Sequence, residues 1–272
     1  MNSNQRIKGL SLKVGPLGEN DRLLTLLSEE SGISRFAIPG ARKPKSRLGA
    51  TSPFTFLDLH IIGKKNLKRV TQIKILKSYG NLGKHIETLS AAQAISELIM
   101  ILVGKDDPQK ELLKIVLIHL NRLDNLHKNE FNSLHSLAIT VQSCIHLLAL
   151  AGYCLPLQNC CRSGSKLIPP IGEWSWRCSL IPEEGFAIGS MPNSDIELNP
   201  SELALLQRLL KKDIPFHSNG SILGPEYVWL KLLRVVEVWI ETHLQRRINS
   251  LEMMRDIYAS NDLLRKSNSR ER

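Results

Sequence analysis

The fold is decided near the start of the chain, by the stretch LSLKVGPLGENDRLLTLL at residues 10–27. Apolar and polar residues alternate from Leu10 to Val14, and a second apolar run follows a turn that opens with Gly15 and Pro16. Alternation on either side of such a turn is typical of paired strands. Further runs of this kind predict strands at 33–38, 54–61 and 70–76. Five short strands predict a small barrel or sandwich over residues 1–80.

From about His85 the apolar period becomes helical. Asp107 before Pro108, and Asn199 before Pro200 with Glu202 at the third position, are typical helix starts. The predicted helices cover 89–103, 108–123, 134–150, 203–210 and 225–248. The sequence therefore predicts an α+β chain with three parts, namely a barrel domain at 1–80, a helical domain at 81–250 with an irregular region at 154–198, and a C-terminal tail at 251–272.

Composition excludes several classes of protein. The 272 residues are 42% apolar and 23% charged, as in a globular chain. The first residues hold no apolar segment of a secretory signal. Polar residues recur every three or four positions within the long uncharged stretch 131–161, which favours a bundle helix over a membrane span. Five clustered cysteines, an odd number, indicate a reducing compartment, so we expect a cytoplasmic protein.

The positive charge is concentrated in the first third of the chain. Residues 1–85 hold 16 Lys and Arg against five Asp and Glu, whereas the remaining residues hold 20 against 21. No acid lies between Glu30 and Asp58. A domain-wide basic excess favours polyanion binding over the alternative of a solvated lysine-rich face. The candidate DNA-binding residues are Arg35, Arg42, Lys43, Lys45, Arg47, Lys64, Lys65, Lys68 and Arg69.

The first of these clusters falls in a predicted loop at 40–49. Pro44 disfavours a helix there, and we expect Gly40 and Gly49 to leave the ends of the loop pliable. Such a loop can lay several cations along a phosphate strand.

Catalytic motifs are absent from the sequence. The Gly80–Lys84 segment lacks the length and the Ser or Thr of a phosphate-binding loop, and Ser163–Lys166 matches only a short string without its companion motifs. We therefore predict no catalytic residue and no cofactor. Four cysteines could still gather around one metal ion, namely Cys154, Cys160, Cys161 and Cys178, although no Cys-x-x-Cys pair is present.

The N-terminal third resembles the RecO family of bacterial recombination mediators. The resemblance is carried by GPLGENDRLL at 15–24, by EESG at 29–32 and by the basic loop GARKPKSRL at 40–48. Pro53-Phe54, Glu97-Leu98, Gly152-Tyr153 and the WIETHL segment at 239–244 extend it over most of the chain, with 155–199 the weakest part. The resemblance implies an OB-fold barrel joined to a helical domain.

Many members of this family carry a four-cysteine zinc module in the helical part. Here Cys160 matches the first ligand, but Ser163 and Gly189 stand where the second and third are expected. The resemblance therefore implies a metal-free, degenerate version of the module, which we expect to pack around Trp174, Trp176 and Phe186.

The resemblance also implies a function in DNA repair and recombination after DNA damage, by the RecF pathway. Such a protein binds single- and double-stranded DNA, anneals complementary strands and helps load RecA onto strands coated with single-strand-binding protein. Its implied partners are RecR and the acidic C-terminal tail of single-strand-binding protein. Two alternatives stay open, an OB-fold RNA-binding module and a metal-dependent nuclease, although five acids in the first 85 residues disfavour a metal-binding carboxylate cluster.

Overall fold

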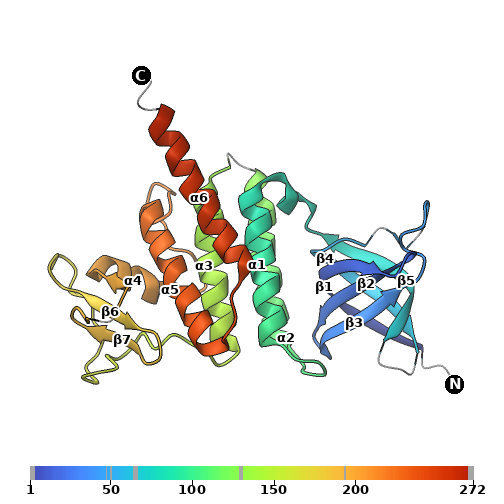
Figure 1. Cartoon of the computed structure of the whole chain (residues 1–272), viewed down its shortest axis with the longest axis horizontal. Coiled ribbons are helices and arrows are strands. Elements are labelled where there is room, and N and C mark those ends of the chain that lie inside the picture. Colours follow the sequence, from blue (N-terminus) through green and yellow to red (C-terminus); the bar gives the residue numbers. More distant parts are fainter. Residues whose placement is uncertain are drawn as a thin grey trace. The chain divides into compact units, whose positions relative to one another are not determined.

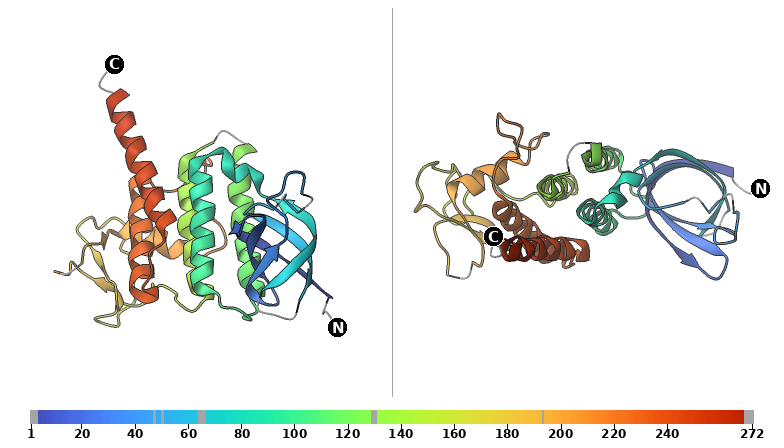
Figure 2. Two further views of the ribbon diagram at one scale, coloured as in Figure 1. Left: turned by 45° about the vertical axis from the view of Figure 1, so that its right-hand side comes forward. Right: turned by 90° about the horizontal axis from the view of Figure 1, so that it is seen from above.

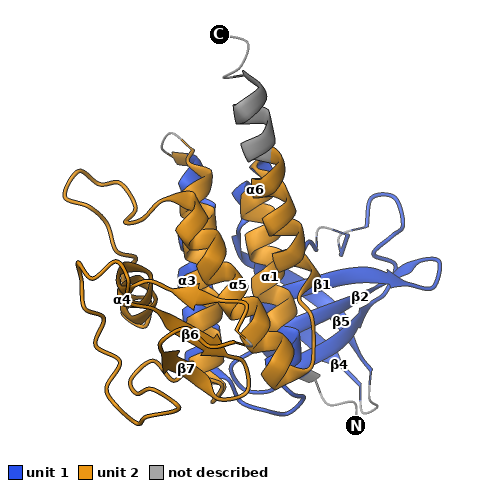
Figure 3. Ribbon diagram, turned by 60° about the vertical axis from the view of Figure 1, so that its left-hand side comes forward, with its two compact units in different colours: residues 1–84, 99–127 blue, residues 85–98, 128–272 orange. Residues whose placement is uncertain are grey.

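The computed structural model describes residues 4–46, 48–49, 51–63, 67–128, 131–192 and 194–268. The chain forms two compact units, a barrel unit made of 1–84 with 99–127 and a helical unit made of 85–98 with 128–272 (Figure 3). Helix α1 (Ile86–Leu102) therefore contributes its last residues to the barrel unit and the rest to the helical unit. The domain boundaries predicted at residues 80 and 250 separate parts of the chain that we expect to fold independently. These boundaries remain a prediction.

Five strands close the barrel in the order β1-β2-β3-β5-β4, as an α+β chain with an N-terminal OB-fold requires (Figures 1 and 2). All neighbouring strands pair in antiparallel orientation except β3 and β5, which are parallel. The predicted five-stranded barrel followed by helices is confirmed. The strands are β1 (Asn4–Leu17), β2 (Asp21–Ser28), β3 (Gly32–Ile38), β4 (Thr55–Ile62) and β5 (Lys68–Ser78).

Strand alternation fills the barrel interior. Side chains such as Leu24, Leu26, Leu57 and Leu59 are fully buried there, while the residues between them face outward. The fifth strand closes the set by adding Val70 to the same core. The phase of the apolar residues in the sequence thus decided which face of each strand became core.

Besides the end of α1, three helical elements belong to the barrel unit. They are η1 (Gly80–Lys84), α2 (Lys110–Asn125) and η2 (Leu126–Lys128), the last of which ends in the helical unit. Helix α2 starts two residues later than Asp107 and Pro108 predict, so that prediction is wrong. The backbone N–H of Gln109 donates to Glu29 (2.9 Å) and that of Asp106 to Ser31 (3.1 Å), and these bonds fix the segment to the β2–β3 turn.

The helical unit holds α3 (Ser133–Leu150), α4 (Pro200–Arg208), α5 (Glu226–Leu244) and α6 (Asn249–Asn268), beside a small sheet. The sheet has the order β7-β6-β8, with β6 (Cys178–Ile181), β7 (Gly185–Ile188) and β8 (Glu197–Leu198). At α4 the predicted capping box is confirmed. The Asn199 side chain accepts from the Glu202 N–H at 2.9 Å, and the Glu202 carboxylate accepts from the Asn199 N–H at 2.9 Å.

Helix α3 is the single helix, among the residues that the structure describes, that is long and apolar enough to cross a membrane. It packs as a core helix instead, because 67% of it is buried within the protein. Two of its polar side chains bond within the helix, since the Thr140 hydroxyl donates to the Ser136 carbonyl (2.7 Å) and the Ser143 hydroxyl donates to the Thr140 carbonyl (2.8 Å). The predicted bundle helix is thereby confirmed.

The C-terminal part differs from the prediction of one helix to Ile248 and a tail after it. Helix α5 ends at Leu244, where Gln245 takes a left-handed conformation (φ 51°), and α6 follows. Leu251, Met254 and Tyr258 form a buried face on α6 at helical spacing. The helical spacing of these three apolar residues is visible in the sequence, but the polar residues between them led to the prediction of a tail.

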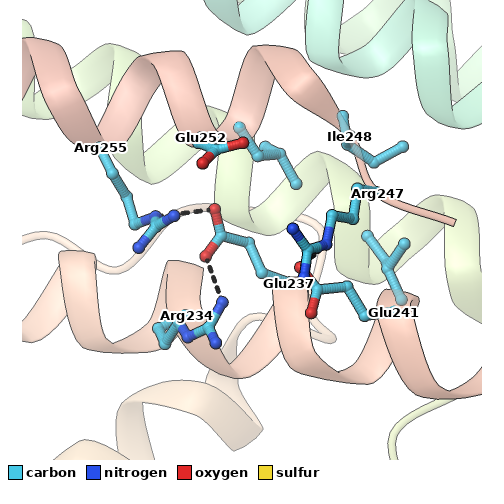
Figure 4. A pocket seen from close by; sticks show the side chains of 9 residues that line it. Arg234, Glu237, Glu241, Arg247, Ile248, Glu252 and Arg255 are labelled. Carbon is cyan, nitrogen blue, oxygen red and sulfur yellow. Dashed lines mark hydrogen bonds and ion pairs between the residues drawn. The ribbon is translucent and has the colours of Figure 1, made fainter.

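Two polar contacts fix α6 inside the helical unit. At its start, the N–H and hydroxyl of Ser250 donate to the Glu97 carboxylate at 3.2 and 2.8 Å. Further along, Glu237 of α5 accepts from Arg234 (3.2 Å) and from Arg255 of α6 (3.0 Å), as Figure 4 shows. These charged groups line a 250 Å³ pocket between the two helices.

Candidate nucleic-acid interface

The basic loop between β3 and β4 is fixed to the turn between β1 and β2. The Gly40 N–H donates to the Asp21 carboxylate (2.8 Å), and the Arg42 N–H donates to the Asn20 carbonyl (2.9 Å). The Arg42 guanidinium donates to the Gly18 carbonyl (2.8 Å). The prediction of pliable loop ends is therefore wrong at this end of the loop.

Arg22 fixes the far end of the same loop. One nitrogen of its guanidinium donates to the carbonyls of Gly49 and Thr51, both at 3.1 Å. Arg22 and Arg42 also line a 460 Å³ depression, with Val14, Gly15, Pro16, Thr51, Ser52 and Pro53. Sequence reasoning missed this role of Arg22, although the residue belongs to the GPLGENDRLL segment that carries the family resemblance.

Between its two ends the loop is built from successive turns. Backbone bonds join Lys43 to Gly40, Ser46 to Lys43 and Gly49 to Ser46 at 3.1–3.2 Å. Ala41 of this loop is buried in the barrel core, whereas Arg42, Lys43 and Lys45 are exposed. The predicted Arg47 lies outside the described residues.

Arg35 belongs to a row of residues that crosses three strands. It is the register partner of Thr25, which in turn is the partner of Lys13. Both cations are exposed while Thr25 is buried between them. Lys13 was missed in the sequence, although its place between Leu12 and Val14 on a strand indicated an outward side chain.

The second predicted cluster lies where β5 begins. Lys68 and Arg69 are register partners of Phe36 and Ala37, just before the basic loop, and Arg69 is also the partner of Ile62. The Lys68 ammonium donates to the Gln5 side chain at 2.6 Å. The structure therefore brings these two residues beside the strand that carries Arg35, while Lys64 and Lys65 lie outside the described residues.

Two family models match almost the whole chain. The model described as "Recombination protein O N terminal" matches residues 1–79, and that described as "Recombination protein O C terminal" matches residues 83–252. The chain belongs to the RecO family. Proteins named DNA repair protein RecO are its relatives in Prochlorococcus marinus (strain MIT 9303) and Synechococcus sp. (strain WH7803), at 53% and 54% identity. The alignments cover 96% and 94% of this chain and 98% and 95% of those relatives. Family membership places the chain among proteins of DNA repair and recombination.

The region where the resemblance implies a degenerate zinc module shows no zinc-binding ligand set among its described residues. Among the residues that the structure describes, no three His, Cys, Asp or Glu side chains lie close enough together to hold a metal ion. Gly189 has no side chain to offer, and Trp174 is 75% exposed. Phe186 is fully buried as expected, but the predicted packing around Trp174 is wrong. The residues present do not fit a four-ligand zinc site.

Cys160 nevertheless lies in surroundings that favour a thiolate. Its sulfur accepts from the N–H of Ser163 (3.4 Å) and of Ile188 (3.3 Å). Burial opposes ionisation of this thiol, but these bonds, together with one from the Ser163 side chain, lower its pKa to about 7. By contrast, burial raises the pKa of Cys178 to about 12.

Proposed function

We propose that the barrel binds single- and double-stranded DNA, promotes annealing of complementary strands and helps load RecA onto strands coated with single-strand-binding protein. The observation that carries the proposal is the fixed basic loop. Arg42, Lys43 and Lys45 are exposed on a segment that hydrogen bonds hold at both ends. A fixed loop loses less conformational entropy on binding than a mobile one, so more of the phosphate attraction becomes affinity.

The proposed interaction is with the phosphate backbone. Cations that neutralise phosphates release counterions, which gives affinity that is independent of base sequence and falls with salt. The described cations of the interface are Lys13, Arg35, Arg42, Lys43, Lys45, Lys68 and Arg69. The aromatic residues Phe36 and Phe54 are buried, so base stacking on them is disfavoured. Annealing then follows from screening the repulsion between two polyanions.

We further propose that the protein acts without catalysing a reaction. Pairing two strands breaks no covalent bond, and the first 85 residues hold only five carboxylates that could bind a catalytic metal ion. Strand cleavage that depends on magnesium and is lost with one carboxylate would favour a nuclease. Stronger binding to structured RNA than to DNA at one salt concentration would favour a translation-type RNA-binding module.

The proposed partners follow the family, namely RecR and the acidic tail of single-strand-binding protein, with RecA as an indirect one. The helical unit offers an apolar depression of 410 Å³ for such a tail, lined by Leu157, Leu167, Ile168 and Leu210. Lys166 lies at the same depression and supplies a cation for an acidic peptide. We propose a cytoplasmic site of action, and a DNA-binding barrel domain at residues 1–80.

Strand annealing across a salt series tests the proposal. Complementary oligonucleotides, bare or coated with single-strand-binding protein, are mixed with the purified chain, and duplex formation is followed by fluorescence. We expect faster annealing in both cases, declining steeply as salt rises. Annealing no faster than without the protein, at every salt concentration, would contradict the proposal.

A further inference from the structure

A second polar surface lies on the barrel, on the outer face of β1, β4 and β5. The strand register aligns Arg6 with His60 and Gln72 in one row, and Lys8 with Asp58 and Lys74 in the next. Their neighbours in the sequence, such as Ile7, Leu57 and Leu59, face the core. The six outward residues therefore form one continuous lattice across three strands.

A buried carboxylate organises this lattice. The Asp58 side chain is only 2% exposed and accepts from two nitrogens of Arg6, with its Nε at 2.7 Å. The hydrogen bond from Arg6 lowers the pKa of Asp58 against the opposing effect of burial, and the charges of Arg6, Lys8 and His60 lower it further. Asp58 is consequently ionised at neutral pH and holds the guanidinium in one orientation across two strands.

Arg6 itself stays accessible, since 59% of its side chain is exposed. A guanidinium has five N–H donors. Asp58 accepts from two of them, one on each of the two nitrogens that face it. None of the other residues that the structure describes accepts from the remaining donors. The result is a guanidinium that is fixed from below and open to an external acceptor, which suits bidentate recognition of a phosphate.

Lys8 and Lys74 flank Asp58 on either side and are both exposed. Neither lysine is needed to neutralise Asp58, because Arg6 already forms an ion pair with it. Neither lysine forms an ion pair within the part of the chain that the structure describes. Three cations thus surround one already paired carboxylate, and the excess positive charge is available to an external polyanion.

We propose that this lattice is a second phosphate-binding track, which takes a second DNA strand while the basic loop holds the first. The inference rests on the proposed function and deepens it, because annealing brings two polyanions together. Leu17 lies at the turn to which the basic loop is fixed, and Lys8 lies nine residues before it on the same strand. The two sites are therefore separated by roughly 30 Å along an extended strand. Asp58 is a positioning residue, because it acts by orienting Arg6.

The test compares two double variants in the full-length protein. K8Q with K74Q removes two cations of the track, and K43Q with K45N removes two of the loop, where asparagine tolerates the left-handed conformation of Lys45 (φ 61°). All four side chains are exposed, so both variants should fold, which the melting temperature checks. Native mass spectrometry with a short oligothymidylate gives the number of strands bound, and fluorescence gives the annealing rate.

We expect two strands per wild-type chain at low salt and one per chain in the track variant. Annealing by the track variant should fall about tenfold, as loss of two phosphate contacts implies, while the first strand binds within about twofold of wild type. A track variant that binds two strands and anneals normally would overturn the inference and leave the proposed function intact. A wild-type chain that binds no DNA would overturn the proposed function itself.

Asp58→Asn separates positioning from simple electrostatics. Removal of a negative charge from a cationic surface should tighten DNA binding if only net charge matters. If Asp58 orients Arg6, the same change should lower the annealing rate despite the added positive charge. Faster annealing by a folded D58N variant would contradict the positioning role, and the two lysine substitutions test the track even if D58N does not fold.

Discussion

At the scale of a single residue, we predict that the Cys160 thiol ionises near neutral pH. Hydrogen bonds from Ser163 and Ile188 lower the pKa of its thiol to about 7, so half of the molecules should carry the thiolate near pH 7. Absorbance at 240 nm during a pH titration should show one thiolate transition there. The transition should vanish in Cys160→Ser and persist in Cys154→Ser, and a wild-type chain without it would contradict the account of this site.

The same thiol should make stability depend on pH in a known direction. A thiol of lowered pKa binds fewer protons in the folded than in the unfolded state, so the free energy of unfolding rises between pH 7 and about 9. This stabilisation is fully present above that window and is lost as the pH falls through 7. Urea midpoints of wild type and Cys160→Ser should therefore diverge across the window, and parallel curves would exclude the effect.

Single residues also show where sequence reasoning succeeds and where it stops. The exposure of Arg42 and Lys43 was predictable from a run of cations without acids. The hydrogen bonds of Arg22 and Arg42 were not, because a guanidinium that binds a carbonyl and one that binds a phosphate have the same sequence signature. Only the folded loop distinguishes the two roles.

At the scale of elements, Glu237 should hold α5 and α6 together. Its buried carboxylate accepts from Arg234 and Arg255, and both arginines can reach water if it is lost. We expect Glu237→Gln to lower the free energy of unfolding by about 1–3 kcal/mol. Glu252→Gln, an exposed residue of the same pocket, should change it by less than about 0.5 kcal/mol. Equal midpoints in urea for the two variants would refute this role.

The capping box of α4 should contribute measurably to stability. Asn199→Ala removes the acceptor for the Glu202 N–H and should cost about 1 kcal/mol in chemical denaturation. The neighbouring exposed Ser201→Ala is the matched control and should be nearly neutral. If both variants unfold at the wild-type midpoint, the cap contributes nothing.

Helix starts illustrate the limit of local signals. Asn199 caps α4 as the sequence predicts, because both bonds of a capping box lie within four residues. Asp107 does not cap α2, because distant carbonyls in the β2–β3 turn bind the backbone N–H groups of that segment. A long-range contact overrode a local preference that the sequence alone could show.

At the scale of the whole molecule, the barrel was predictable because apolar alternation and Gly/Pro turns fix its strands. The polar lattice of Arg6, Lys8 and Asp58 was not, since its members come from strands 50 residues apart whose register the sequence does not reveal. The same reason hid the row formed by Lys13 and Arg35. Charge content is visible in a sequence, whereas its distribution over a surface requires the fold.

The most direct test of the central claim is the salt dependence of DNA affinity in wild type and in the K43Q/K45N loop variant. Loss of two phosphate contacts should lower the slope of log affinity against log salt by about 1.4 for single strands and about 1.8 for duplex. The control K110Q/K114Q removes equal charge from exposed positions of α2 and should keep the wild-type slope. A folded loop variant with the affinity and slope of wild type would show that the basic loop does not bind DNA.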